Sequence, residues 1–156
     1  MRISMALVVG GLACLHFLLH VGFGAGLAAP DLLTVGLLIA ARELRTGWAA
    51  GLGFVFGLLE DALSVLAFGA NALTMTVVGI AGARTRELFV GDSLLFVVSY
   101  FFIGKWLRDI VHWILVGEEL RRPFVEQALL QGFTGAAYAA LVGLVVLGVT
   151  GLSTER

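Results

Sequence analysis

The stretch GFVFGLLEDALSVLAFGANAL, residues 53–73, sets two adjacent carboxylates, Glu60 and Asp61, inside an apolar run that ends in a Gly-Ala-Asn sequence. Its apolar residues do not alternate with polar ones, as the strands of a membrane barrel would. In an apolar solvent, a helix is the structure that gives backbone groups partners within their own segment. Gly69 and Asn71 suit a tight turn. The stretch therefore predicts the end of one helix, a turn and the start of the next.

The composition of the whole chain indicates that its solvent is a lipid bilayer. Of 156 residues, 60% are hydrophobic and only 13% are charged, and the mean hydropathy is +1.01. A soluble domain has about 25% charged residues, and too few are present here for a polar surface. The net charge of −1 gives no basic face for nucleic acid, and the single cysteine, Cys14, excludes an internal disulfide. We expect one all-α polytopic transmembrane domain over residues 1–156.

Six apolar segments are predicted as membrane spans, at about residues 5–21, 27–41, 47–66, 71–83, 93–116 and 124–150. A straight span needs about 20 residues. The second and fourth segments are shorter, so they borrow flanking residues, cross a thin region or form a re-entrant element. The choice between five and six spans stays open. The first segment resembles a signal peptide, but its uncharged run is long for one, and we expect it to stay uncleaved.

The distribution of Lys and Arg predicts that both termini are cytoplasmic. Residues on one side of the six-span arrangement are Arg2, Arg42, Arg45, Arg84, Arg86 and Arg156, whereas Arg121 and Arg122 lie on the other. The side with more basic residues faces the cytoplasm. Glu60 and Asp61 then lie near the outer end of the third span, where acids reach the headgroup zone. Adjacent helical residues point about 100° apart, so we expect one acid to face the bundle and the other water.

Small residues at helical spacing predict close helix packing. The third span has Gly47, Gly51, Gly53 and Gly57, and the sixth has Gly135, Ala139 and Gly143. Such residues let backbones approach closely in lipid. Two interpretations stay open: the faces pack the protein's own bundle, or one of them docks a partner's transmembrane helix or a second copy.

The fifth span contains a polar stripe, Lys105, Arg108, Asp109 and His112, at the spacing of one helical face. The stripe either faces the bundle interior, a cleft or a partner, where it could receive the acids of the third span, or it is the solvated end of the span. His16 and His20 have a spacing that can hold a metal, but a polar packing face is the simpler interpretation. No P-loop, H-E-x-x-H or G-x-S-x-G motif occurs, so nothing requires an enzyme or a cofactor.

The short spans, the Pro-Asp pair and the pattern G-F-x-x-G-x-x-x-D-x-x-S-x-x-x-x-G resemble the bacterial rod shape-determining protein MreD family. The matching positions are Pro30, Asp31, Gly53, Phe54, Gly57, Asp61, Ser64 and Gly69, followed by Ala72 and Leu73. The motif covers about residues 30–86, and Glu60 lies outside it. The resemblance implies a compact six-helix bundle similar to the substrate-binding subunits of energy-coupling-factor transporters. It also implies that Asp61, Ser64, Gly69 and Asn71 shape an outer corner, where Asp61 caps the turn or anchors a partner's helix.

The function implied by the resemblance is that of a non-enzymatic inner-membrane scaffold of the cell-elongation machinery. Such a protein is expected to bind the transmembrane helix and juxtamembrane region of MreC. It would thereby link MreB filaments to the peptidoglycan polymerase RodA and its penicillin-binding partner.

Two other functions are kept in view. The first is a substrate-binding subunit of a vitamin-type transporter with an outward cleft near Asp61, Arg108 and His112. Its expected Ala-x-x-x-Ala coupling motif matches only Ala25 and Ala29, which lie on the wrong side of the membrane. The second is an intramembrane enzyme that uses His16, His20 and the acids.

Overall fold

The computed structural model describes residues 3–22, 30–64, 67–88 and 93–151, and every regular element within them is helical. The elements are α1 (Ile3–Phe17) continued by the π-helical η1 (Leu18–Gly22), α2 (Leu32–Ala41), α3 (Thr46–Leu63), α4 (Ala70–Leu88), α5 (Leu94–Leu115), the 3₁₀ turn η3 (Glu118–Leu120), the π-helical η4 (Val125–Gln131) and α6 (Gly132–Thr150). The predicted all-helical class is confirmed. Two stretches, Ser4–Gly22 and Val125–Thr150, are long and apolar enough to cross a membrane.

The helix bounds differ from the predicted segments at two places. The fourth segment, predicted as residues 71–83, is a longer helix of 19 residues, because Arg84 and its neighbours continue the helix. The second is shorter: α2 has 10 residues, about 15 Å, which is half of a hydrocarbon core about 30 Å thick. Some sequence expectations concern residues outside the described ranges, namely 27–29, 65–66, Arg2, Ala25, Ala29 and Arg156.

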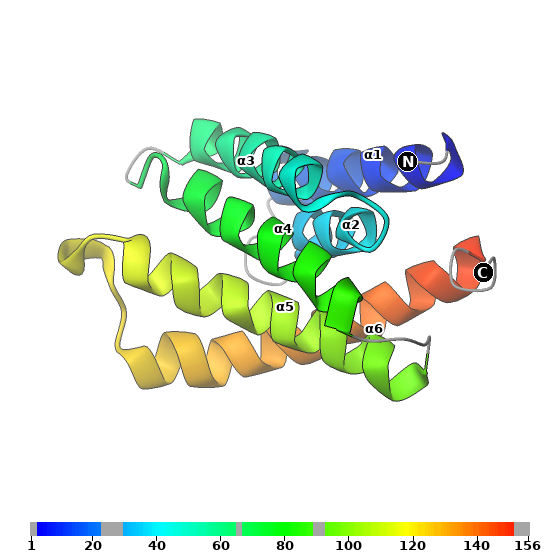
Figure 1. The fold of residues 1–156 in the computed structure, drawn as a ribbon. Helices are drawn as coiled ribbons and strands as arrows, with labels where there is room; N and C mark the ends of the chain where they lie inside the picture. The colour runs from blue at the N-terminus through cyan, green and yellow to red at the C-terminus, as the bar shows by residue number, and fades with distance from the viewer. Residues whose placement is uncertain (1–2, 23–29, 65–66, 89–92, 152–156) are drawn as a thin grey trace.

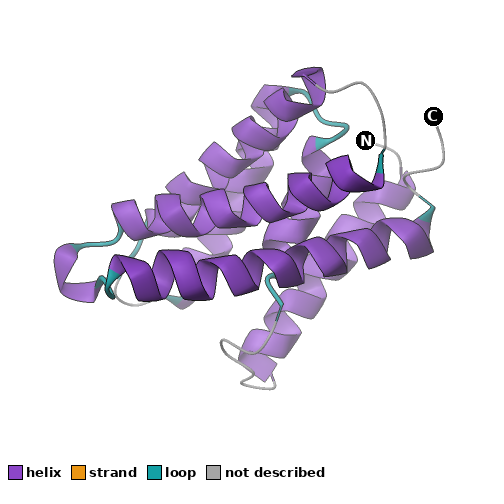
Figure 2. Cartoon of the chain, turned by 90° about the horizontal axis from the view of Figure 1, so that it is seen from below, coloured by secondary structure: helices purple, strands orange, loops and turns teal. Residues whose placement is uncertain are grey.

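The short helix α2 is the centre of the bundle. All ten of its residues are buried, and it packs against each of the other five α-helices. Figure 1 shows α1 and α3 along the top, α5 and α6 along the bottom, and α2 and α4 between them. Viewed from below, the long helices lie side by side, and loops join their ends (Figure 2). The sequence of α2 is an almost uninterrupted apolar run, because other helices cover every side of this helix.

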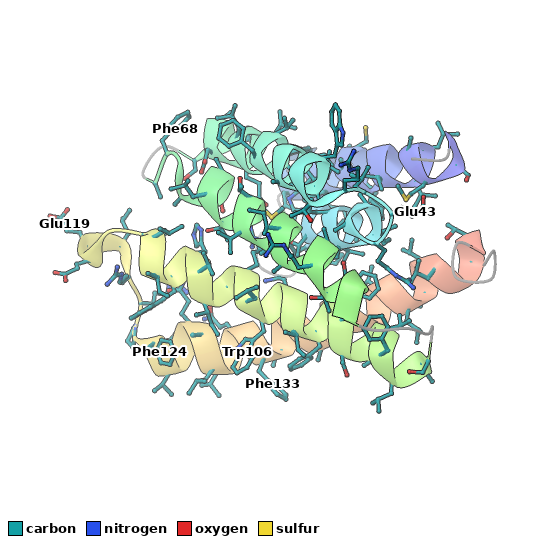
Figure 3. The ribbon with its side chains drawn as sticks, in the orientation of Figure 1. Glu43, Phe68, Trp106, Glu119, Phe124 and Phe133 are labelled. Atoms are coloured by element: carbon teal, nitrogen blue, oxygen red, sulfur yellow. The ribbon has the colours of Figure 1, made fainter. Side chains whose placement is uncertain are left out.

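The outer surface of the bundle is apolar, unlike that of a soluble domain. Large exposed side chains occur on all the long helices, and Phe68, Phe124 and Phe133 point away from the bundle (Figure 3). The exposed Trp48 lies in the first turn of α3. Several ionic side chains lie inside the bundle, in the cluster described below.

Helices α3 and α4 are packed backbone to backbone by glycines. A Cβ atom added at Gly53 would overlap the Met75 carbonyl, and one added at Gly57 would overlap the Asn71 carbonyl. Gly47 and Gly51 have nothing within 4 Å of such an atom. The four glycines of the third span thus serve two faces, one inside the bundle and one open. Gly57, one of the glycines that a partner's helix could have met, is an internal contact with α4.

The small residues of α6 face α5. A Cβ atom at Gly143 would overlap the ring of Phe101, and Ala139 is fully buried. At Gly135 it would come within 3.8 Å of Lys105 Nζ, an ordinary van der Waals contact with α5. These three residues pack against other helices of the same chain, which is the first of the two interpretations given for the small-residue faces.

The two glycine faces of α3 give a stability prediction. Gly57→Ala should lower the stability by roughly 1–3 kcal/mol or more, because its methyl group must displace the α4 backbone. Gly51→Ala, on the same helix, should be neutral or stabilising by up to about 1 kcal/mol, because it lowers the entropy cost of the helix without a clash. Thermal unfolding of the purified variants in detergent measures both. Equal melting temperatures for the two variants would contradict the packing described here.

Candidate functional site: a buried ionic cluster

Ionic side chains from four parts of the chain meet inside the bundle. Asp31 precedes α2 and caps it, accepting hydrogen bonds from the Thr34 amide (3.0 Å) and hydroxyl (2.8 Å). Glu60 lies in the last turn of α3, and His16 lies near the end of α1. Helix α5 contributes Lys105, Arg108 and Asp109. We refer to these six residues as the ionic cluster. The end of α1, the start of α2 and the end of α3 lie together, and the middle of α5 passes beside them.

Arg108 joins the two acids that come from other helices. Its Nη1 lies 3.0 Å from Asp31 Oδ2, and its Nη2 donates to Glu60 Oε2 at 2.7 Å. Lys105 pairs with Asp109 one turn along the same helix, and its Nζ lies 3.7 Å from Asp31 Oδ2. The paired side chains are only 8–16% exposed. The stripe on α5 therefore faces the bundle interior and receives an acid of α3, and it is not a solvated helix end.

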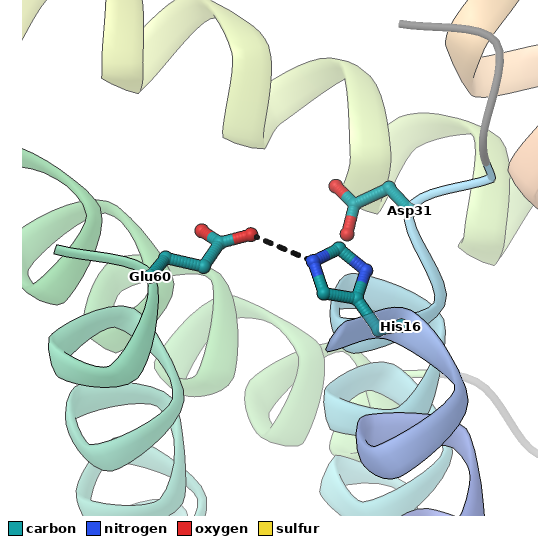
Figure 4. Close-up of side chains that lie close together, drawn as sticks. All are labelled: His16, Asp31 and Glu60. Carbon is teal, nitrogen blue, oxygen red and sulfur yellow. Dashed lines mark ion pairs between the residues drawn. The ribbon is translucent and has the colours of Figure 1, made fainter. Parts of the chain in front are cut away.

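The charges of the ionic cluster do not balance without a histidine. Three carboxylates, Asp31, Glu60 and Asp109, face two permanent cations, Lys105 and Arg108. The third candidate cation is His16, whose Nε2 lies 3.5 Å from Glu60 Oε1 (Figure 4). His16 thus gives Glu60 a second polar partner beside Arg108, which matters because a buried carboxylate without partners is costly.

Asp61, next to Glu60, has a separate role. Its carboxylate accepts hydrogen bonds from the backbone amides of Asn71 (3.1 Å) and Ala72 (2.9 Å), in the first turn of α4. Only 1% of the residue is exposed. A carboxylate at this position satisfies orphan amides and complements the helix dipole. Asp61 thus caps the helix after the turn, as the resemblance implies.

The expectation that one acid of the pair faces water is wrong. Both Glu60 and Asp61 turn into the protein, and neither reaches outward from the helix end. Because the two side chains point about 100° apart, they contact two different neighbours. Glu60 reaches Arg108 of α5, and Asp61 reaches the start of α4.

The other predicted corner residues lie around these two acids. Gly69 has a φ of 94°, which a glycine adopts without strain. Asn71 is already helical, and its Oδ1 lies 3.5 Å from Arg108 Nη2. Ser64 is the residue after α3, and the Pro30 carbonyl accepts a hydrogen bond from the Leu32 amide at 2.9 Å. These residues shape the corner, with the left-handed turn at Gly69 and not at Asn71.

His112, the last residue of the predicted stripe, is less firmly held than the others. The residue is partly exposed, and its Nδ1 has no hydrogen-bond partner among the described residues. The structure therefore brings three of the four stripe residues into the ionic cluster and leaves His112 one turn beyond it.

Three potential metal ligands meet in the cluster, but the positive charge beside them is already supplied by a side chain of the protein. Ligand atoms of His16, Asp31 and Glu60 lie within 4.8 Å of one another. Arg108 already pairs with both carboxylates, so a dication would have to lie next to a guanidinium. His20 does not complete a metal pair with His16. Its Nδ1 lies 3.0 Å from the His16 carbonyl, and the two rings stack with centroids 4.1 Å apart.

Sequence reasoning did not identify Glu60 and His16 as partners, since they lie on separate helices that are not neighbours in sequence. Thr34 was also missed. Its signal was readable, because Asp is a preferred first residue before a helix, and its carboxylate accepts from the amide two or three residues further on.

Comparison of the chain with protein-family models, with curated proteins and with solved structures gives no match.

The ion-pair geometry predicts that Arg108 is essential for stability. Arg108→Gln should cost roughly 3–5 kcal/mol, because two buried carboxylates lose their main counter-charge. Arg84→Gln is the matched control, since Arg84 is exposed on α4, and such surface changes usually stay within about 0.5 kcal/mol. Thermal unfolding in detergent distinguishes the two. A melting temperature for Arg108→Gln equal to that of the control would mean that the ionic cluster does not stabilise the bundle.

Proposed function

We propose that the chain is a non-enzymatic, multi-pass scaffold of the inner membrane, of the MreD type, that organises the cell-elongation machinery. The proposal rests on the structural roles of the motif residues. Asp31 and Asp61 cap helices, Gly57 admits the α4 backbone, and Gly69 makes the left-handed turn. Each of these roles builds a fold. This is what a motif of a scaffold would encode, whereas an enzyme's motif would leave some reactive groups free for a substrate.

Membrane embedding is supported by the lengths and surfaces of the helices. Helix α5 has 22 residues, about 33 Å, which matches a hydrocarbon core about 30 Å thick. The apolar exterior and the buried charges are the arrangement expected for a protein in lipid. Trp48 lies in the first turn of α3, and 73% of this residue is exposed. Such exposure is expected for an aromatic anchor at the membrane interface. The short α2 would then be a half-span enclosed by the other helices.

The open glycine face of α3 is the surface that best fits a partner's transmembrane helix. Gly47 and Gly51 are exposed, with no atom near a Cβ added at either position, and Val55 and Leu58 continue the exposed surface. Without a hydrophobic force between helices in lipid, close backbone approach stabilises association. On this proposal the face receives the transmembrane helix of MreC, which connects the chain to MreB, RodA and its penicillin-binding partner. A homodimer would use the same face.

The transporter alternative has less support. Asp61 and Arg108, which would have to bind a substrate, are occupied by contacts within the protein. One cavity formed by the described residues lies elsewhere, between α4 and α5, and its lining contains neither of them nor His112.

The proposed topology can be tested with single cysteines. In a Cys14→Ser background, Glu119→Cys should react with a membrane-impermeant maleimide added to spheroplasts, because η3 lies at the outer end of the bundle. Glu43→Cys, in the turn between α2 and α3 near the other end (Figure 3), should react only after permeabilisation. Equal labelling of both positions in intact spheroplasts would exclude this orientation.

Partner binding is tested by a substitution that the fold tolerates. Gly51→Leu places a bulky side chain on the open face of α3 and should reduce co-purification of MreC by about tenfold, the effect of losing about 1.4 kcal/mol of binding. Gly148→Leu on α6, which is equally free of neighbours, is the control and should bind as the unchanged protein does. Affinity purification in mild detergent with quantitative mass spectrometry measures both. Undiminished recovery with Gly51→Leu would move the interface away from this face.

A further inference from the structure

The two ends of the bundle differ in the charge of their side chains. Glu119 marks the end that contains η3, and Glu43 marks the end that contains the turn between α2 and α3 (Figure 3). Outside the ionic cluster, the charged side chains described at the η3 end are three acids and two bases, Glu118, Glu119, Glu126, Arg121 and Arg122. Those described at the other end are one acid and three bases, Glu43, Arg42, Arg45 and Arg84. The end with the α2–α3 turn is therefore basic.

Two arginines of the basic end have no role in holding the fold together. Arg45 and Arg84 are exposed, and no ion pair or side-chain hydrogen bond joins either of them to another described residue. Arg45 directly precedes α3, where a negative side chain would be favourable, and it makes no capping hydrogen bond. By contrast, Arg121 at the η3 end donates to the carbonyls of Ile114 and Val116. The charges of Arg45 and Arg84 are therefore left for a group outside the chain.

The packing of α3 against α4 brings these two arginines to the same place. A Cβ atom added at Gly79 of α4 would overlap the carbonyl of Ala49 of α3. Ala49 also shares a small buried cluster with Ala83. Arg45 is one turn before Ala49, and Arg84 is the residue after Ala83. The two guanidinium groups thus extend from either side of one helix contact.

An exposed aromatic side chain indicates the depth at which the two arginines would lie in a membrane. Trp48 is three residues after Arg45, so the two side chains share a face of α3, and 73% of Trp48 is exposed. Further along the helix, exposed Val55 and Leu58 are apolar. Trp is typical of the boundary between the headgroups and the hydrocarbon core. At this depth, the negative groups that an arginine meets are lipid phosphates, which it binds with paired hydrogen bonds.

We infer that Arg45 and Arg84 form a surface that binds the headgroups of anionic phospholipids in preference to zwitterionic ones. This inference rests on the proposed membrane location and orientation, but not on the proposed partner. The phosphate of phosphatidylethanolamine already has an ammonium group in the same headgroup, whereas that of phosphatidylglycerol has none. Anionic lipids of the cytoplasmic leaflet attract basic residues close to the membrane surface. A free phosphate ion has the same charge chemistry but no chains to hold it at the depth of Trp48.

The test measures which lipids stay bound to the purified full chain. The chain is reconstituted in vesicles of equal parts phosphatidylethanolamine and phosphatidylglycerol, extracted in mild detergent and analysed with its bound lipids by native mass spectrometry. Phosphatidylglycerol should be retained in preference. Arg45→Gln and Arg84→Gln should each lower the ratio of phosphatidylglycerol to phosphatidylethanolamine about fivefold, the effect of one basic residue near a membrane surface. Arg122→Gln, at an exposed position of the η3 end, is the matched control and should leave the ratio unchanged.

A second measurement needs no variant. Extraction of the unchanged chain at high salt should also lower the ratio, because salt screens exposed charges. A ratio that does not respond to salt would contradict the inference, as would an unchanged ratio in the double variant Arg45→Gln/Arg84→Gln. An equal loss with Arg122→Gln would mean that lipids respond to the net charge and not to this surface.

The remaining results separate the lipid from other occupants and from the proposed function. Displacement of phosphatidylglycerol by inorganic phosphate would mean that the arginines bind a free anion. Loss of MreC co-purification with the double variant, at an unchanged lipid ratio, would mean that they bind a protein. Failure of the unchanged chain to insert into the vesicles would count against the membrane location itself. A preference for phosphatidylglycerol without recovery of MreC would overturn only the proposed partner.

Discussion

The contact of Arg108 with Asp31 and Glu60 is the interaction on which the rest of the bundle depends. It follows from the shortness of α2. A helix of 10 residues that is surrounded by other helices has its first turn inside the protein, where its amides need acceptors. Asp31 supplies the acceptor but adds a buried negative charge. Arg108 compensates that charge and, by reaching Glu60 as well, fixes the positions of α2, α3 and α5 together.

The two ends of α2 therefore have different surroundings. Asp31 at its start lies in the ionic cluster, whereas Leu38, about 10 Å further along the helix, forms the floor of an apolar cavity. Polar contacts thus specify how the helices meet at one end. Glycines on the surrounding helices decide how closely they approach α2 at the other. If the bundle lies in lipid, as proposed, apolar side chains gain little by leaving the solvent, and these two features would supply the specificity that a hydrophobic core supplies in water.

Much of this arrangement could be predicted from sequence, but only where the signal is local. The helical class follows from composition, and the turn at Gly69 follows from residue types a few positions apart. The cap at Asp61 was one of two roles that the family resemblance implies for this residue. The sequence leaves open whether the α5 stripe faces the bundle interior or is a solvated helix end. Periodicity shows that residues share a face but not what that face contacts. The contacts of His16 with Glu60 and of Arg108 with Asp31 join distant segments, and no local pattern encodes them.

The assignment of residues to internal roles limits where a partner can bind. Most of the charged groups that would attract a ligand within the bundle are already paired with one another, and the motif residues support the fold. On the proposed scaffold function, recognition of other proteins would use the apolar exterior, where shape and small residues give specificity. The open glycines of α3 meet that requirement, since Gly53 and Gly57 on the same helix are already used against α4. One helix thus packs against α4 on one face and leaves Gly47 and Gly51 open on another, as the proposed scaffold function would require.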